Sequence, residues 1–174
     1  MPSAFLRLCR TAAVSSCLAL ALSACGSSSS DDDSDMPEAF SVVGQASFTS
    51  SASNAGSSVN ALGVAQPLGG IATNGTLFYV ADYGNHRILG WNSIPSTLSK
   101  APDFVIGQSD FTSNSSGTTA SKLALPASVS ITDTRLVVAD AGNNRVLIWN
   151  SLPTSNVAPD VVVGQSDFTS DDPG

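Results

Sequence analysis

The stretch that decides the fold occurs twice in this chain of 174 residues. Residues 79–95 read YVADYGNHRILGWNSIP, and residues 137–153 read VVADAGNNRVLIWNSLP. Asp82 of the first copy returns as Asp140, which sets a period of 58 residues. A fixed period of this size indicates stacked repeat units, because each unit is too small to bury both of its apolar faces by itself.

A second motif follows the same period. It reads Val or Ile, then Gly-Gln, then small polar residues around a Phe, and it occurs at residues 43–50, 106–113 and 163–170. Its first occurrence precedes both copies of the longer stretch. We expect it to form a lone strand near Ser41 to Gln45, followed by a linker, so that residues 40–66 make one segment.

Within one period the sequence predicts four short strands. Apolar residues alternate or run together between turn residues such as Ala141-Gly142-Asn143, which tolerate positive φ. In the second period the expected strands span residues 127–132, 135–140, 144–150 and 160–164. No stretch with helical periodicity follows residue 39, so the predicted fold class is all-β, with units of four antiparallel strands.

The motif Ala81-Asp82-x-Gly84-Asn85-x-Arg87, which follows an apolar pair and a leading Pro67, resembles the NHL repeat. The copy from Pro126 to Trp149 matches equally well. This resemblance implies a β-propeller with NHL-type blades at residues 67–113 and 114–170. Residues 171–174 would then begin the next linker.

Two blades do not close a propeller, which normally has about four to eight. The incomplete ring has two explanations. Either the chain is a truncated fragment of a larger propeller, or several copies assemble, and a homo-trimer would supply six blades. Open apolar faces would otherwise be exposed at both ends of the stack.

The first residues predict export and lipid anchoring. Residues 1–24 combine Arg7 and Arg10 with an apolar run and small residues, as in a secretory signal. Leu22-Ser23-Ala24-Cys25 resembles the bacterial lipobox, which implies that Cys25 is lipidated. A polar Ser/Asp tether follows over residues 25–39. An ordinary cleaved signal or a short buried helix are the alternatives.

The anchor would place the domain at the bacterial cell envelope. In lipoproteins of double-membrane bacteria, Asp after the lipidated Cys marks retention in the inner membrane, and this chain has Gly26 there. The resemblance therefore favours the outer membrane. The other cysteines, Cys9 and Cys17, lie within the expected signal peptide, so no disulfide is expected in the mature domain.

Composition argues against several functions. The formal net charge is −7, with only seven Lys and Arg, so a nucleic-acid partner is not expected. The chain has one His and one Glu, His86 and Glu38. These cannot supply the converging ligands or the nucleophile and base of an enzyme, so we expect no catalytic residue, metal site or cofactor. Calcium in an acidic loop is left open.

The polar residues that recur in both periods are interpreted as structural, because a catalytic set would be unique. They are expected to pair with each other and with turn amides. These residues are Asp82, Asn85, Arg87, Asp140, Asn143 and Arg145. Aromatic residues that recur in phase are likewise assigned to packing, namely Trp91 and Trp149 between units and Phe48, Phe111 and Phe168 in the core.

Residues that break the repeat are better candidates for specific recognition. On the loop face these are Tyr83, His86 and Asn144, although a histidine beside a turn is also commonly just solvated. The expected function is a lipid-anchored binding or scaffold module for a protein or glycan. The alternative is a propeller enzyme of lactonase or lyase type whose catalytic residues lie on missing blades.

Overall fold

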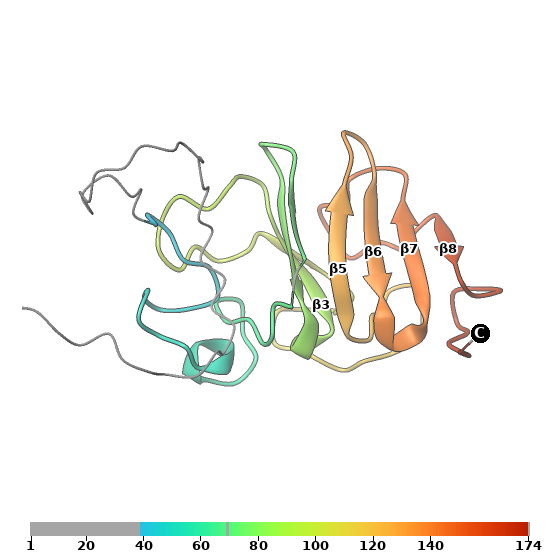
Figure 1. Ribbon diagram of the computed structural model, residues 1–174, viewed down its shortest axis with the longest axis horizontal. Helices are drawn as coiled ribbons and strands as arrows, with labels where there is room; N and C mark the ends of the chain where they lie inside the picture. The colour runs from blue at the N-terminus through green and yellow to red at the C-terminus, as the bar shows by residue number, and fades with distance from the viewer. Residues whose placement is uncertain (1–38, 69, 174) are drawn as a thin grey trace, which may run out of the picture.

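The computed structural model describes residues 39–68 and 70–173. The expected signal peptide, Cys25 and the tether up to residue 38 lie outside the described residues. Within the described part the fold is all-β, with two four-stranded antiparallel sheets and a few short 3-10 turns. In Figure 1 the first sheet stands between residues 39–66 on one side and the second sheet on the other.

Each sheet is a simple meander in which neighbours in sequence are neighbours in space. The first sheet has the order β1 (Ile71–Thr73), β2 (Phe78–Asp82), β3 (Arg87–Trp91) and β4 (Phe104–Ile106). The second has the order β5 (Pro126–Ile131), β6 (Leu136–Asp140), β7 (Arg145–Trp149) and β8 (Val161–Val163). Each strand expected in the second period is present, within one residue at either end.

The strand turns of the two sheets are built alike. The 3-10 turns η3 (Tyr83–Asn85) and η4 (Ala141–Asn143) join the second and third strands of their sheets. Each is followed by a residue in the left-handed region, His86 with φ 54° and Asn144 with φ 50°. The register is also repeated, because Asp82 pairs with Arg87 as Asp140 pairs with Arg145.

The two sheets pack face to face around one apolar cluster. The first sheet contributes Tyr79, Ala81, Ile88, Phe104 and Ile106, and the second contributes Val129, Leu136, Val138, Leu147 and Trp149. Burying each of the larger side chains stabilises the fold by about 1.5–3 kcal/mol. Trp149 therefore packs between the sheets, as expected.

The opposite face of the first sheet has its own cluster. Phe78, Val80, Leu89 and Trp91 pack with Val64, and Val43 lies against them. Phe78 and Trp91 meet edge to face, with ring centroids 5.6 Å apart. Residues 39–66 thus contribute to the core although they contain no strand.

Two expectations for residues 40–66 are wrong. No strand forms at Ser41 to Gln45, since Val43 to Gln45 are bends and no strand among the described residues lies beside them to share a ladder. The element that does form in this segment is the short 3-10 turn η2 (Ser53–Gly56). Phe48 is not a core residue, since 46% of its surface is exposed, whereas Phe111 and Phe168 pack against the two clusters.

Candidate functional site

The turns η2, η3 and η4 lie at the same end of the molecule, along the lower edge of Figure 1. The chain leading into each sheet returns to this end. Residues of these linkers, 49–66 and 112–125, bond directly to the strand turn of the sheet that follows them. We call this end, formed by η3, η4 and the two linkers, the turn face.

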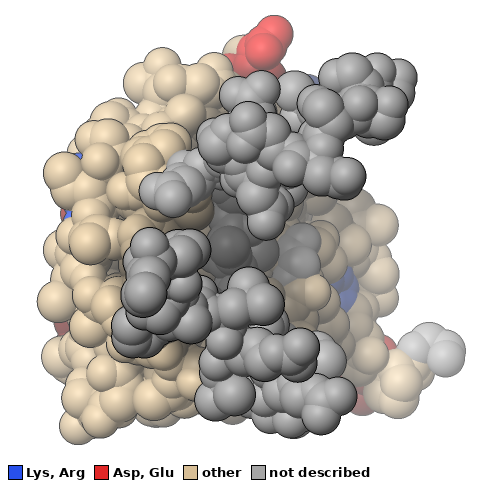
Figure 2. Space-filling view, turned by 60° about the vertical axis from the view of Figure 1, so that its left-hand side comes forward, with Lys and Arg blue, Asp and Glu red and all other residues tan. Residues whose placement is uncertain are grey.

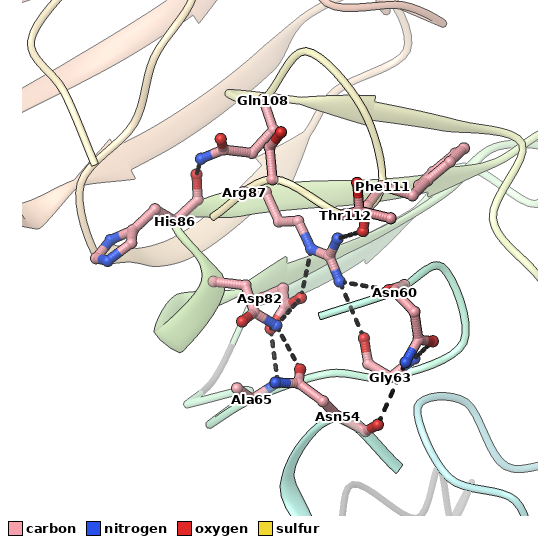
Figure 3. A network of polar contacts seen from close by, with 12 residues as sticks. Asn54, Asn60, Gly63, Ala65, Asp82, His86, Arg87, Gln108, Phe111 and Thr112 are labelled. Carbon is pink, nitrogen blue, oxygen red and sulfur yellow. Dashed lines mark hydrogen bonds and ion pairs between the residues drawn. The ribbon is translucent and has the colours of Figure 1, made fainter. Parts of the chain in front are cut away.

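A buried carboxylate organises the turn face of the first sheet (Figure 3). Asp82 accepts hydrogen bonds from the Ala65 amide at 2.7 Å, from the Asn85 carboxamide at 2.8 Å and from Arg87 Nε at 2.7 Å. The side chains of Asp82 and Arg87 are fully buried. The carboxylate therefore joins the linker, the strand turn and β3 at one point.

Arg87 extends this network to both ends of its repeat. Its terminal nitrogens donate to the carbonyl oxygens of Asn60 and Gly63 in the preceding linker and of Phe111 after β4. The guanidinium thus uses its fixed fork of donors to hold three chain segments together. Asn85 adds a bond from its carboxamide to Asn54 Oδ1 at 2.7 Å.

The second sheet repeats the central bonds of this arrangement. Asp140 accepts from the Ala124 amide at 2.7 Å and from Arg145 Nε at 2.8 Å, and Asn143 donates to the same carboxylate. Arg145 also donates to the carbonyl of Phe168, the counterpart of Phe111. The backbone amides that donate to these two carboxylates belong to the linkers. The sequence predicts amides of the strand turns instead, and that prediction is wrong.

Burial disfavours the ionised form of the Asp82 carboxyl group. Desolvation raises the pKa of Asp82, and the Arg87 guanidinium, the Ala65 amide and the Asn85 carboxamide act in the opposite direction. With both oxygens engaged by donors of the same chain, the geometry assigns this residue to holding the turn face together.

His86 has a structural partner that the sequence did not suggest. Its Nδ1 accepts a hydrogen bond from the Leu125 amide at 3.0 Å, and its carbonyl accepts one from Gln108. The first of these bonds links the turn of the first sheet to the entry of the second. Burial lowers the pKa of His86, and the charges of Asp140 and Asp82 oppose that shift. The ring is therefore neither freely solvated nor available through Nδ1.

The other two candidates are more open to solvent. Tyr83 is half-buried, and no described hydrogen bond engages its side chain. Asn144 is exposed and donates to the Asp171 carbonyl at 2.8 Å, which leaves its Oδ1 without a described donor. The His86 amide donates to the Tyr83 carbonyl within the strand turn, but no described side-chain hydrogen bond joins Tyr83, His86 and Asn144, so the structure places them at one end of the molecule without a shared side-chain cluster.

The glutamines of the three Gly-Gln motifs were missed in the sequence analysis. Gln108 donates from Nε2 to the carbonyls of His86 and Ser115, and Gln165 donates in the same way to Asn144 and Asp172. The available signal was their recurrence in all three copies of the motif. Each of these two glutamines ties the end of its sheet to the strand turn of that sheet.

The loop after each of these glutamines is closed by a carboxylate. Asp110 accepts from the amides of Thr112 and Ser113, and Asp167 accepts from those of Thr169 and Ser170. These bonds and those from the neighbouring hydroxyls hold the pKa of Asp110 well below its usual range and lower that of Asp167 to about 2. Both loops are local turns stabilised by their own side chains.

Charged groups are sparse on the described surface of one face of the molecule. On the face shown in Figure 2, the described atoms are almost all uncharged, with charged side chains at the margins. Within residues 39–68 and 70–173, no three His, Cys, Asp or Glu side chains gather as they would around a metal ion. None of the described helices has the length and apolar character of a membrane span.

The chain was also compared with known proteins. A scan against protein-family models gives no match, and a search of curated proteins finds no similar sequence.

Proposed function

We propose that the chain is part of an NHL-type β-propeller that is held at the bacterial cell envelope by a lipid on Cys25. It acts there as a binding or scaffold module for a protein or a glycan, and the turn face is its recognition surface. The proposal rests on two sheets with the same strand order, register and buried Asp–Arg pair, stacked face to face. Successive blades of a propeller have this relation.

The proposal of a recognition surface rests on which polar groups of the turn face are already hydrogen-bonded within the chain. The repeated residues are committed to bonds within the chain, while Tyr83 and Asn144 differ between the two repeats and retain free polar atoms. Long linkers rich in Ser, Thr and Asn surround them. Sites on repeat scaffolds are commonly built from such variable loop residues on a rigid framework.

The lipid anchor is tested by fractionation of cells that express the chain. We expect the native chain in the membrane fraction, and Cys25→Ser should move it to the soluble exported fraction. Cys17→Ser is the matched control, because that cysteine lies within the expected signal peptide. Retention of the Cys25→Ser variant in membranes would show that another segment attaches the chain.

The recognition surface is tested by binding to purified peptidoglycan, lipopolysaccharide and envelope proteins. Tyr83→Ala and Asn144→Gly remove the two side chains, and glycine keeps the left-handed backbone at position 144. Thr76→Ala is the control, because Thr76 is exposed in the turn between β1 and β2, at the other end of β2 from η3. Binding that is lost in the first two variants and kept in the third supports the proposal. Binding equal in all three, or to none of the probes, contradicts it.

A further inference from the structure

Residues 41–52 reproduce the local structure found where each sheet ends. Gly44, Gly107 and Gly164, which follow Val43, Ile106 and Val163, have φ of 84°, 89° and 96°. The turn is therefore the same in all three copies, although only the last two follow a strand that is paired in a sheet.

The glutamine after each of these glycines forms the same bond. Each donates from Nε2 to the carbonyl seven residues later, at 2.9 Å for Gln45, 3.0 Å for Gln108 and 2.8 Å for Gln165. The acceptors are the carbonyls of Ala52, Ser115 and Asp172. Residues 45–52 thus have the conformation of a sheet end although no paired strand precedes them among the described residues.

Gln45 lacks a bond that the strand turn of a sheet supplies to the other two glutamines. Gln108 and Gln165 also donate to the carbonyls of His86 and Asn144, the left-handed residues in the strand turns of their own sheets. Gln45 has no such acceptor among the described residues. Its Oε1 is buried without a hydrogen-bond partner, alone among the side-chain polar atoms of the described residues, and the residue is only 9% exposed. Oε1 is an acceptor and needs a donor, which Lys122 Nζ supplies to the Oε1 of Gln108 at 3.1 Å, so this atom is a second unmet contact, separate from the missing turn carbonyl.

Phe48 lacks its partner in the same way. The carbonyls of Phe111 and Phe168 accept from Arg87 and Arg145 in the third strands of their sheets. At the matching distances before Phe48 the sequence has Ala24 and Cys25, neither of which can donate as an arginine does. The exposed side chain of Phe48 and its missing arginine both follow if the sheet that should precede it is absent.

The segment also contacts the first sheet as the end of the first sheet contacts the second. The Gly107 amide donates to Asn156 Oδ1 in the connection between β7 and β8, at 2.9 Å. In the corresponding connection of the first sheet, the Ser99 amide donates to the Val42 carbonyl and Ser99 Oγ donates to the Gln45 carbonyl. Residues 42–45 therefore occupy, on the first sheet, the place that the end of β4 occupies on the second.

We infer that Ser41 to Gln45 becomes the outer strand of a third four-stranded sheet when another stretch of polypeptide supplies the three inner strands. That stretch carries the same repeat, with an apolar strand pair, a turn ending in a left-handed residue, and an arginine. Its turn carbonyl would accept from Gln45, and its arginine would donate to the Phe48 carbonyl. This inference rests on the proposed propeller and specifies how its ring is closed.

This docking of residues 41–45 restricts how copies of the chain can assemble. The outer place of the second sheet is already filled by β8, which pairs with β7. A ring made of three copies would bring β8 of one copy and residues 41–45 of the next into the same position at every joint. The intact chain should therefore not form the homo-trimer, and the partner of residues 41–45 must lack an outer strand of its own.

Removing β8 provides such a partner from this chain itself. A variant that ends at Pro159 presents a three-stranded sheet, β5 to β7, with a free edge at β7. We expect the variant to associate head to tail in sedimentation velocity, at an integer multiple of the chain mass, while the intact chain sediments as a single copy. Val162→Pro in the intact chain is the second variant, because it removes the Val162–Leu147 pairing and should free the same edge.

The control is Val43→Asp in the shortened chain. It places a charge in the docking strand and should return the variant to single-chain mass. Equal assembly with and without Val43→Asp would show non-specific association of a free edge and would overturn the inference. A single-copy mass for both β8 variants, with sheet content retained by circular dichroism, would also overturn it, as would a trimer of the intact chain. None of these outcomes depends on the membrane or glycan experiments above.

Discussion

The two sheets have the same strands, the same register and the same buried Asp–Arg pair, yet they differ in how they are covered. Every residue of β2 and β3 is buried, whereas β6 and β7 alternate between buried and half-buried residues. In β8 the two residues on the outer face, Val161 and Val163, are 40% and 51% exposed. Burial in this protein is thus decided by what lies beside a sheet, more than by the sheet itself.

Side chains on the corresponding faces reflect this difference. On the face of the first sheet that packs against the second sheet, Tyr79 lies beside Gly90, and Gly90 lies beside Phe104. A methyl group on Gly90 would overlap the Phe104 ring, so the glycine makes room for it. The second sheet has Val137, Ile148 and Val161 at these positions, a row of branched side chains without an aromatic ring.

The outer face of the second sheet is also apolar at most of the corresponding positions. Its two rows run through Ala139, Val146 and Val163, and through Val137, Ile148 and Val161, with Ser128 and Ser130 at the β5 margin. The residues at the corresponding positions of the first sheet form its contact with the second sheet. A further sheet stacked in the same way would cover this surface, as the proposed propeller requires.

The largest expected effect tests whether the two polar networks are equivalent. Arg87→Met and Arg145→Met each leave a buried carboxylate without its cation, which should lower the free energy of unfolding by about 3–5 kcal/mol. Urea denaturation measures both. Adding Asp82→Leu to Arg87→Met should recover part of the loss, because it removes the uncompensated charge. A loss below about 1 kcal/mol would contradict the structural role of the pair.

The second prediction tests the difference in burial between the face shared by the two sheets and the outer face of the second sheet. Ile88→Ala removes a fully buried side chain between the sheets and should cost about 2–5 kcal/mol. Its counterpart Val146→Ala lies on the half-buried outer face and should cost about 1 kcal/mol or less, since little area is lost from contact. Equal losses in urea denaturation would mean that the outer face is covered in solution.

A smaller effect concerns the polar bond between the sheets. Tyr79 Oη donates to the Pro153 carbonyl at 3.1 Å in a buried position, and burial raises the pKa of Tyr79 to about 12. The hydroxyl therefore stays protonated as a donor at neutral pH. Tyr79→Phe should cost about 0.5–1.5 kcal/mol by removing this bond. Val137→Thr, at the counterpart on the open face, is the matched control and should change stability much less.

The smallest effect depends on pH. Because burial lowers the pKa of His86 in the folded chain, unfolding takes up protons once the pH falls below the ordinary value of about 6.5. Stability should therefore decline from pH 6.5 downward, by at most about 1.4 kcal/mol per pH unit from this group. His86→Asn copies the left-handed residue of the second repeat and should remove this part of the slope. An unchanged slope in that variant would exclude His86 as its source.

Much of the fold could be predicted from the repeat. The alternation around Val146 and Leu147 and the turn residues Gly142 and Asn143 located the strands of the second period to within one residue. The pairing of Asp140 with Arg145 was also expected, because the two positions recur together. These features are local, so a single sequence carries enough information to locate them.

The candidate site could be predicted only in part. Tyr83 and Asn144 do lie at the turn face, but the bond from the Leu125 amide to His86 joins residues from different sheets and has no local signature. The same holds for Gln45, whose conformation follows its motif while its Oε1 has no partner among the described residues. Residues 41–45 read as a strand because of their composition, and they are not one because a strand requires a neighbour.

The sequence by itself determined the repeat, the strand pattern within it and the polar pairs that hold each turn, since all of these depend on residues close together in the chain. Only the tertiary structure decided which faces are covered, how His86 ties one sheet to the next, and that residues 41–45 form no strand. Those properties depend on which surfaces meet, and burial and strand pairing are contributed by the neighbour as much as by the residues themselves.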